Sequence, residues 1–127
     1  MGIEKIETAG APKAIGPYSQ AVRAGDYLFF SGQIPLDPRS GEVVSGGIEM
    51  QTEQVMANLG AVLQAAGLEF SQVVKTTIYL QDLGDFAAVN AIYGRFFPGI
   101  APARATVQVA GLPKGVGVEI EGIAYGG

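Results

Sequence analysis

Neither cysteine nor histidine occurs in the 127-residue sequence. Without cysteine the chain forms no disulfide and has no thiol nucleophile, and without histidine it lacks the serine–histidine and cysteine–histidine pairs of many hydrolases. Zinc sites built from cysteine and histidine are excluded as well. Few other side chains could do chemistry, which gives weight to any arginine and carboxylate that the folding pattern brings together.

Charge is also scarce, because only 16% of the residues are charged and the formal net charge is −4. An acidic chain is a poor candidate for non-specific nucleic-acid binding, which depends on neutralising phosphates. No hydrophobic run approaches the length of a membrane span, and the N-terminus has no signal-peptide core. We therefore expect a cytoplasmic protein that binds neither nucleic acid nor membranes.

The hydrophobic content of 48% is typical of a compact globular protein. The length suffices for one domain with a real core, and we find no internal repeat, linker or low-complexity segment. The sequence therefore predicts a single domain over residues 1–127. The small charged fraction also hints that another subunit covers part of the apolar surface.

Hydrophobic spacing predicts the order of helices and strands. Helical spacing begins near Ile48 and continues to Ala66, where Gly67 is a plausible C-terminal stop. A second helix follows Asp82, a candidate N-cap, and ends before Pro98. The segments expected as strands from their alternation and turn residues are 3–6, 19–24, 27–31 and 74–80.

The segments 102–108 and 118–124 have the most suggestive pattern. In both, apolar residues alternate with polar ones, and the Gly/Pro-rich loop between them predicts an antiparallel pair of strands. If the apolar faces align, Arg104, Glu119 and Glu121 share one polar face. Such a face offers a fork of donors for a carboxylate, and a carboxylate to handle a proton or a water. The alternative is an ordinary cross-strand charge pair on a solvated face, worth about 0.2–1 kcal/mol.

Together these elements predict an α+β fold, a single mixed sheet with two helices on one face. The expected order of elements along the chain is β-ββ-α-β-α-ββ. The other face of the sheet would be partly bare, which suggests packing against other subunits. The residues expected on that face are Lys75, Thr77, Tyr79, Arg104, Thr106, Glu119 and Glu121.

Four further residues are candidates for a site, although each also has an ordinary structural interpretation. Gly32 directly follows an aromatic strand that ends in Ser31, and glycine at a strand end lets a ligand approach the backbone. Ser31 could equally be a structural hydroxyl, Tyr18 a loop anchor, and Asn90 a solvated helix residue. The glycine-rich segments lack the spacing of phosphate-binding loops and are interpreted as turns.

Four ordered blocks resemble the Rid family of reactive intermediate deaminases, also called the YjgF family, and most closely its RidA subgroup. The resemblance covers nearly the whole chain. The blocks are APKAIGPYSQA at 11–21, SGQIP at 31–35 with 40–42, VKTT at 74–77 with 82–86 and 89–90, and PAR at 102–104 with LPK at 112–114 and VEIE at 118–121.

The resemblance implies a chorismate-mutase-like YjgF fold and a homotrimer, in which three sheets form a central barrel, helices lie outside and clefts lie between subunits. It implies hydrolysis of 2-imino acids such as 2-iminobutanoate and 2-iminopropanoate, the reactive enamine/imine products of dehydratases acting on threonine or serine. The products are 2-oxo acids and ammonia. The resemblance implies no cofactor and no metal.

Two residues receive catalytic roles from the resemblance. Arg104 would grip the substrate carboxylate through its rigid fork of donors, which lysine would not replace well. Glu119 would orient or activate the attacking water. Glu121 resembles a supporting residue more than a catalytic one.

The same resemblance implies substrate-binding roles for the other candidates. The backbone of Gly32 would help to bind the carboxylate, while Tyr18, Ser31 and Asn90 would line the cleft. Many members have cysteine two positions after the arginine, where this chain has Thr106. Its main-chain carbonyl could still hold the water, but thiol-dependent behaviour is put in doubt.

Two other functions stay open at the level of sequence. The cleft could bind a small carboxylate without turnover, although the presence of Arg104 favours an enzyme. Ribonuclease activity, reported for some relatives, is disfavoured by the acidic composition and by the lack of histidine.

Overall fold

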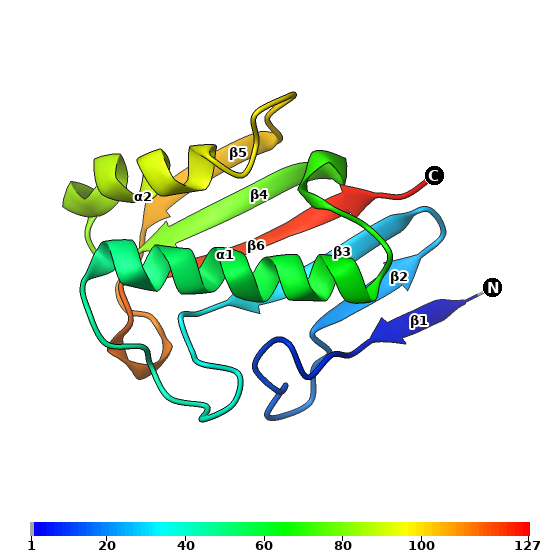
Figure 1. Cartoon of the computed structure of the whole chain (residues 1–127), viewed down its shortest axis with the longest axis horizontal. Coiled ribbons are helices and arrows are strands. Elements are labelled where there is room, and N and C mark those ends of the chain that lie inside the picture. Colours follow the sequence, from blue (N-terminus) through cyan, green and yellow to red (C-terminus); the bar gives the residue numbers. More distant parts are fainter. Residues whose placement is uncertain (1) are drawn as a thin grey trace.

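The structure, a computed structural model, describes residues 2–127 and contains one six-stranded mixed sheet with two helices on the same face (Figure 1). The predicted α+β class is therefore confirmed. The strands are β1 (Ile3–Ile6), β2 (Ala21–Ala24), β3 (Tyr27–Gln33), β4 (Val73–Leu80), β5 (Ala103–Gln108) and β6 (Val118–Tyr125). The helices are α1 (Ile48–Ala65) and α2 (Phe86–Gly94), and short 3-10 turns occupy Phe70–Gln72, Leu83–Asp85 and Pro113–Gly115.

Helix α1 forms because its apolar residues recur at helical spacing and bury one stripe on the sheet. Its end lies where the sequence places it: Ala66 is the C-cap, and Gly67 has a φ of +77°, which favours glycine. The N–H of Gly67 donates to the carbonyl of Gln64. The buried residues of the helix are Thr52, Val55, Met56, Asn58, Leu59, Val62 and Leu63.

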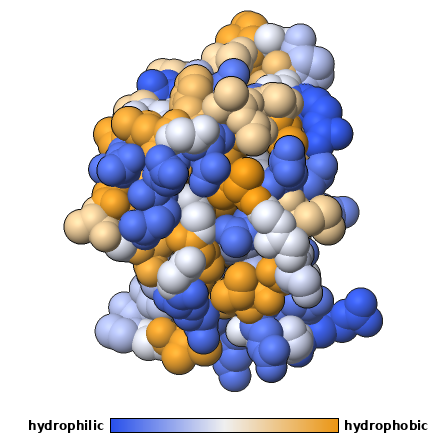
Figure 2. All heavy atoms as spheres, turned by 90° about the vertical axis from the view of Figure 1, so that its left-hand side faces the viewer, coloured by the Kyte–Doolittle hydropathy of each residue, from blue (hydrophilic) through white to orange (hydrophobic). Residues whose placement is uncertain are grey.

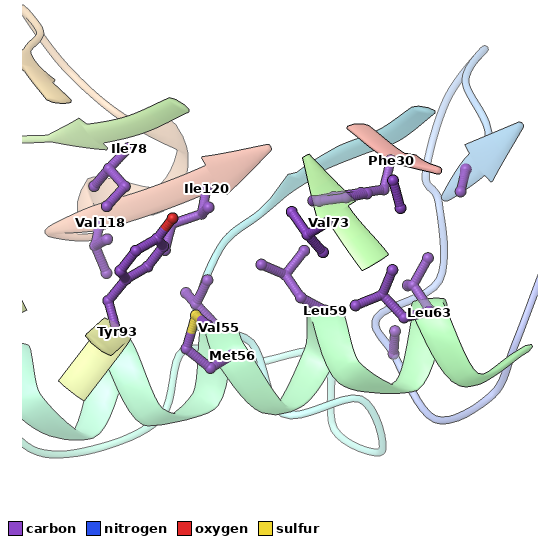
Figure 3. Packing of buried hydrophobic residues seen from close by; sticks show 14 of the residues in the cluster. Phe30, Val55, Met56, Leu59, Leu63, Val73, Ile78, Tyr93, Val118 and Ile120 are labelled. Atoms are coloured by element: carbon purple, nitrogen blue, oxygen red, sulfur yellow. The ribbon is translucent and has the colours of Figure 1, made fainter. Parts of the chain in front are cut away.

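The core between helices and sheet fixes which face of β4 and β6 is covered. Figure 3 shows Ile78, Val118 and Ile120 on the side toward the helices, and all three are at most 1% exposed. Burying such a side chain contributes about 1.5–3 kcal/mol. Because residues alternate along a strand, Tyr79 and Glu119 lie on the opposite, uncovered face.

The antiparallel pair predicted for 102–108 and 118–124 is wrong. The order across the sheet is β1-β2-β3-β6-β4-β5, so β4 lies between β5 and β6. β5 pairs with β4 in parallel, and β6 pairs with β4 antiparallel. The chain leaves β4, forms α2 and returns beside β4, the βαβ connection that parallel neighbours require. The Gly/Pro-rich loop then passes the end of β4 instead of making a hairpin.

This topology reverses the expected orientation of β5. Arg104 is in register with Thr76, and Thr106 is in register with Ile78. Since Thr76 and Ile78 are buried against the helices, Arg104 and Thr106 lie on the helix side of the sheet. The expectation that Arg104 shares a face with Glu119 and Glu121 is therefore wrong.

The second helix begins later than predicted. The carboxylate of Asp82 accepts a hydrogen bond from the N–H of Gly84 at 2.8 Å, so it caps the 3-10 turn Leu83–Asp85 rather than α2 itself. The amide oxygen of Gln108 accepts from the N–H of Leu83 at 2.9 Å, which ties this turn to β5.

The end of the molecule at which α1 and α2 begin mixes hydrophobic and hydrophilic residues, with neither kind dominating (Figure 2). Within residues 2–127, neither helix is long and apolar enough to cross a membrane.

Candidate functional site

Glu119 lies against the backbone of β3. A Cβ atom built on Gly32 would come within 2.0 Å of Glu119 Oε2, so only glycine leaves room for this carboxylate. An irregularity in the β3–β6 pairing between Phe30 and Gln33 accompanies the close approach. Glu119 is half-buried, yet its carboxylate forms no ion pair with another residue of the described chain.

Ser31 of β3 connects this strand by hydrogen bonds to the loop that contains Tyr18. Its hydroxyl donates to the carbonyl of Ser19 at 2.6 Å, and its N–H donates to the carbonyl of Gln20 at 2.9 Å. Tyr18 is 54% exposed, and its hydroxyl accepts a long bond of 3.4 Å from the N–H of Ile15. We call Tyr18, Ser31, Gly32 and Glu119 the glutamate group.

Two neighbours on the uncovered face shape the electrostatics of Glu119. Tyr79 is its direct partner in β4, and Glu121 follows two residues later in β6. Burial raises the pKa of the Glu119 carboxyl, and the charge of Glu121 raises it further. The Tyr79 hydroxyl donates to Glu121 Oε2 at 3.0 Å. Burial and this hydrogen bond raise the pKa of Tyr79, so the phenol keeps its proton and continues to donate.

Replacing Glu121 by glutamine should lower the pKa of Glu119. The substitution removes a neighbouring negative charge and leaves the burial of Glu119 in place, so part of the upward pKa shift persists. The measurement is a titration of the side-chain carboxyl carbon of Glu119 by ¹³C NMR in wild type and variant. Glu49→Gln, a change at an exposed glutamate of α1, is the control. A Glu119 pKa that stays the same or rises in Glu121→Gln would contradict this account.

Arg104 is held by α2. Its Nη1 donates to Asn90 Oδ1 at 2.6 Å. Its guanidinium carbon lies 5.4 Å from the ring centre of Phe86 and 5.2 Å from that of Tyr93, within the range of cation–π attraction. Arg104 is exposed and has no ion-pair partner among residues 2–127. Its other donors are therefore available to an anion.

Thr106 is the third predicted site residue on the helix side of the sheet. Its Oγ1 is buried and has no hydrogen-bond partner within the part of the chain that the structure describes. We call Asn90, Arg104 and Thr106 the arginine group. Its link to Phe86 and Tyr93, whose rings lie close to the Arg104 guanidinium, was not predicted from the sequence. Their spacing with Asn90, at i, i+4 and i+7 of one helix, is the signal that could have revealed it.

The two groups do not meet within one chain. Glu119 points to the uncovered face from β6, whereas Arg104 points to the helix side from β5. With β4 between them, the strands are roughly 10 Å apart, two strand spacings. Among residues 2–127, the Arg104 cation and the half-buried Glu119 carboxylate thus have no ion-pair partner, and they lie on opposite sides of one sheet.

A groove of about 580 Å³ lies along the N-terminal segment and includes Tyr18 and Ser19, but none of Gly32, Glu119 or Arg104. Within residues 2–127, no group of three or more acidic side chains is arranged to hold a metal ion.

Comparison with known proteins places the chain among named relatives. A family model described as endoribonuclease L-PSP matches residues 8–126. Protein DfrA of Myxococcus xanthus is 60% identical over 126 residues, which cover 98% of this chain and 96% of that protein. The 2-iminobutanoate/2-iminopropanoate deaminase of Mus musculus is 53% identical over 122 residues, covering 96% of this chain and 90% of that protein.

Solved structures agree over nearly the full length. A Rid-family protein of Yersinia pestis has a TM-score of 0.95 and 50% identity, with 98% of this chain and 99% of that chain covered. TdcF of E. coli, solved with bound serine, has a TM-score of 0.91 and 44% identity, with 96% and 98% covered. The chain therefore belongs to the Rid, or YjgF, family.

Proposed function

We propose that this protein hydrolyses reactive 2-imino acids, such as 2-iminobutanoate and 2-iminopropanoate, to 2-oxo acids and ammonia in the cytoplasm. One observation carries the proposal: an arginine with free donors and an unpaired carboxylate of raised pKa occur together in one small chain. The first suits the carboxylate of an imino acid, and the second suits the transfer of a proton from water. The name of the mouse relative, and the serine bound to E. coli TdcF, support a ligand of this class.

We propose further that the site forms between two copies of the chain in a homotrimer. Arg104 and Glu119 lie on opposite sides of one sheet, so a single ligand can meet both only if they come from different subunits. The uncovered face supports such packing, because it exposes Tyr27, Phe29 and Tyr125 by more than two fifths each. In a cyclic trimer every subunit would give its arginine group to one cleft and its glutamate group to another.

In this cleft the two groups would bind the substrate from opposite sides. Arg104, oriented by Asn90, would take the carboxylate through two parallel N–H···O bonds. The backbone of Gly32 in the neighbouring copy would help to bind the same carboxylate, beside the Glu119 side chain that lies against it. Tyr18 and Ser31 would line the cleft, and Thr106 Oγ1 has an unused hydrogen bond to offer.

The reaction asks little beyond positioning and one proton-handling group. The carbon of a protonated imine is already electrophilic. Glu119 would accept a proton as water adds to that carbon, and the C–O bond would form as the C=N bond becomes single. The same carboxyl would return its proton to the nitrogen. As the C–N bond breaks and ammonia leaves, the Glu119 carboxylate would take the proton of the new hydroxyl, and the carbonyl of the 2-oxo acid remains. A raised pKa brings Glu119 closer to neutral pH, where a general base is most effective.

The test is a competition with semicarbazide. An amino-acid oxidase generates 2-iminobutanoate or 2-iminopropanoate in situ, and semicarbazide traps it unless hydrolysis is faster. We expect the protein to suppress formation of the imine-derived semicarbazone in proportion to its concentration. If it does not, while calorimetry shows that it binds 2-oxobutanoate, the cleft is a carboxylate-binding site without turnover and the enzymatic proposal fails.

A further inference from the structure

The surroundings of Arg104 go beyond a single hydrogen bond. Phe86, Asn90 and Tyr93 stand at i, i+4 and i+7 on α2, so one stripe of the helix faces one side chain of β5. Two of the three contacts are aromatic rings, at 5.4 and 5.2 Å from the guanidinium carbon. This arrangement restricts the guanidinium in two ways: the amide engages Nη1, and the rings attract the cation.

The ring of Tyr93 is itself fixed. Tyr93 is only 4% exposed, and Figure 3 shows its ring reaching from α2 toward the strands of the sheet. Its hydroxyl is 2.6 Å from the hydroxyl of Thr76, the residue of β4 that pairs with Arg104. Phe97 packs against the ring with centres 4.8 Å apart. The position of the Tyr93 ring is therefore fixed relative to β4, the strand that pairs with the strand of Arg104.

The ring of Phe86 is more open, with 37% of the residue exposed. Its position is still linked to β5, because the preceding turn is held by the bond from the Leu83 N–H to Gln108. Phe86 thus contributes a contact to the cation without being a large part of the core. This makes it the residue at which the contact can be changed while the fold is kept.

We propose that Phe86 and Tyr93 are positioning residues, which hold the guanidinium of Arg104 so that its unengaged N–H groups face a bound carboxylate. The identity of the ligand in this inference rests on the proposed function. The restraint of the Arg104 guanidinium by the two rings does not. An unrestrained arginine must lose side-chain freedom when it binds. The two rings impose that restriction in the free protein, so carboxylates bind more tightly without any direct contact to the rings.

The decisive variant is Phe86→Leu, which keeps an apolar side chain but removes the aromatic face. We expect the KM for 2-iminobutanoate and the Kd for 2-oxobutanoate to rise about two- to thirtyfold, the range of a cation–π contact. The kcat should change much less, because the proton transfers at Glu119 are untouched. Phe86→Trp should restore tight binding, since tryptophan offers the best face for a cation. Leu83→Ala, at an exposed residue of the preceding turn, should behave as wild type.

A readout without ligand separates this inference from the proposed function. In side-chain ¹⁵N relaxation measurements, the Nε–H group of Arg104 should be rigid in wild type and in Phe86→Trp, and more mobile in Phe86→Leu. Equal mobility in all three proteins would overturn the inference, even if the protein is an active deaminase. Increased mobility in Phe86→Leu alone would support it, even if no turnover of imines is found.

Discussion

Arg104→Ala should abolish carboxylate binding and leave the chain folded. The variant loses two charge-assisted hydrogen bonds to the ligand, each worth about 1.5–3 kcal/mol, so kcat/KM should fall on the order of 10²- to 10⁴-fold. The fold should survive because Arg104 is exposed and its hydrogen bond to Asn90 of α2 lies at the surface. The measurements are semicarbazide competition, calorimetry with 2-oxobutanoate and thermal unfolding.

Two further variants sharpen the result for Arg104. Arg104→Lys keeps the positive charge but not the fork of donors, and should recover only part of the binding. Arg95→Ala removes an exposed arginine at the end of α2 that pairs with Glu53, and should leave activity intact. Undiminished binding of 2-oxobutanoate by Arg104→Ala would remove Arg104 from the site. Unfolding or loss of assembly in that variant would make its role structural.

The second large effect is expected for Glu119→Gln, which should keep ligand binding and lose turnover. Glutamine has the same shape but accepts no proton at neutral pH, so the rate should fall about 10²- to 10⁴-fold, the usual contribution of general acid–base catalysis. The space beside Gly32 that accommodates the glutamate also accommodates glutamine. Single-substrate kinetics would show a fall in kcat, while calorimetry would show an almost unchanged Kd for 2-oxobutanoate.

The pH dependence gives an independent check on Glu119. As a base it must be ionised, so wild-type kcat/KM should fall as the pH drops through the raised pKa of Glu119. This fall of kcat/KM at low pH, the acid limb of the profile, should be absent in Glu119→Gln. Glu49→Gln, at an exposed glutamate of α1, should retain both the rate and the limb. Wild-type turnover in Glu119→Gln would exclude this residue from the mechanism.

Much of the fold could be predicted from the sequence, because hydrophobic periodicity and the residues that end helices and form turns are local features. Residues close together in the sequence determine the apolar stripe of α1 and the end of this helix at Gly67. The same is true of the alternation of apolar and polar residues in β4 and β6. The position of β5 is not local. Ala103 and Ala105 suggest a buried face, but at this edge of the sheet they are exposed. The small size of these alanine side chains is therefore no reliable sign of burial. For this reason the alternation predicts the wrong face of β5 as the buried one.

The chain does hold a sign of the correct arrangement. A strand, a helix and a strand in succession favour a right-handed βαβ unit with parallel strands, and α2 stands between β4 and β5. Under that rule β5 lies beside β4 and α2 covers one of its two faces, and the register of Arg104 with Thr76 then decides that Arg104 is on the covered face. The separation of Arg104 from Glu119 could not be deduced from alternation alone, because alternation does not say which face of an edge strand is covered.

The most direct test of a site shared between subunits is to mix two inactive variants. Arg104→Ala and Glu119→Gln chains would be co-expressed with different tags, and doubly tagged assemblies would be purified and tested for imine hydrolysis. If each cleft takes its arginine from one copy and its glutamate from the next, every mixed cyclic trimer has one complete cleft, so about one third of the clefts in the doubly tagged assemblies are restored. Activity well above that of either variant is the predicted result. Mixed assemblies no more active than the two variants alone would contradict the shared site.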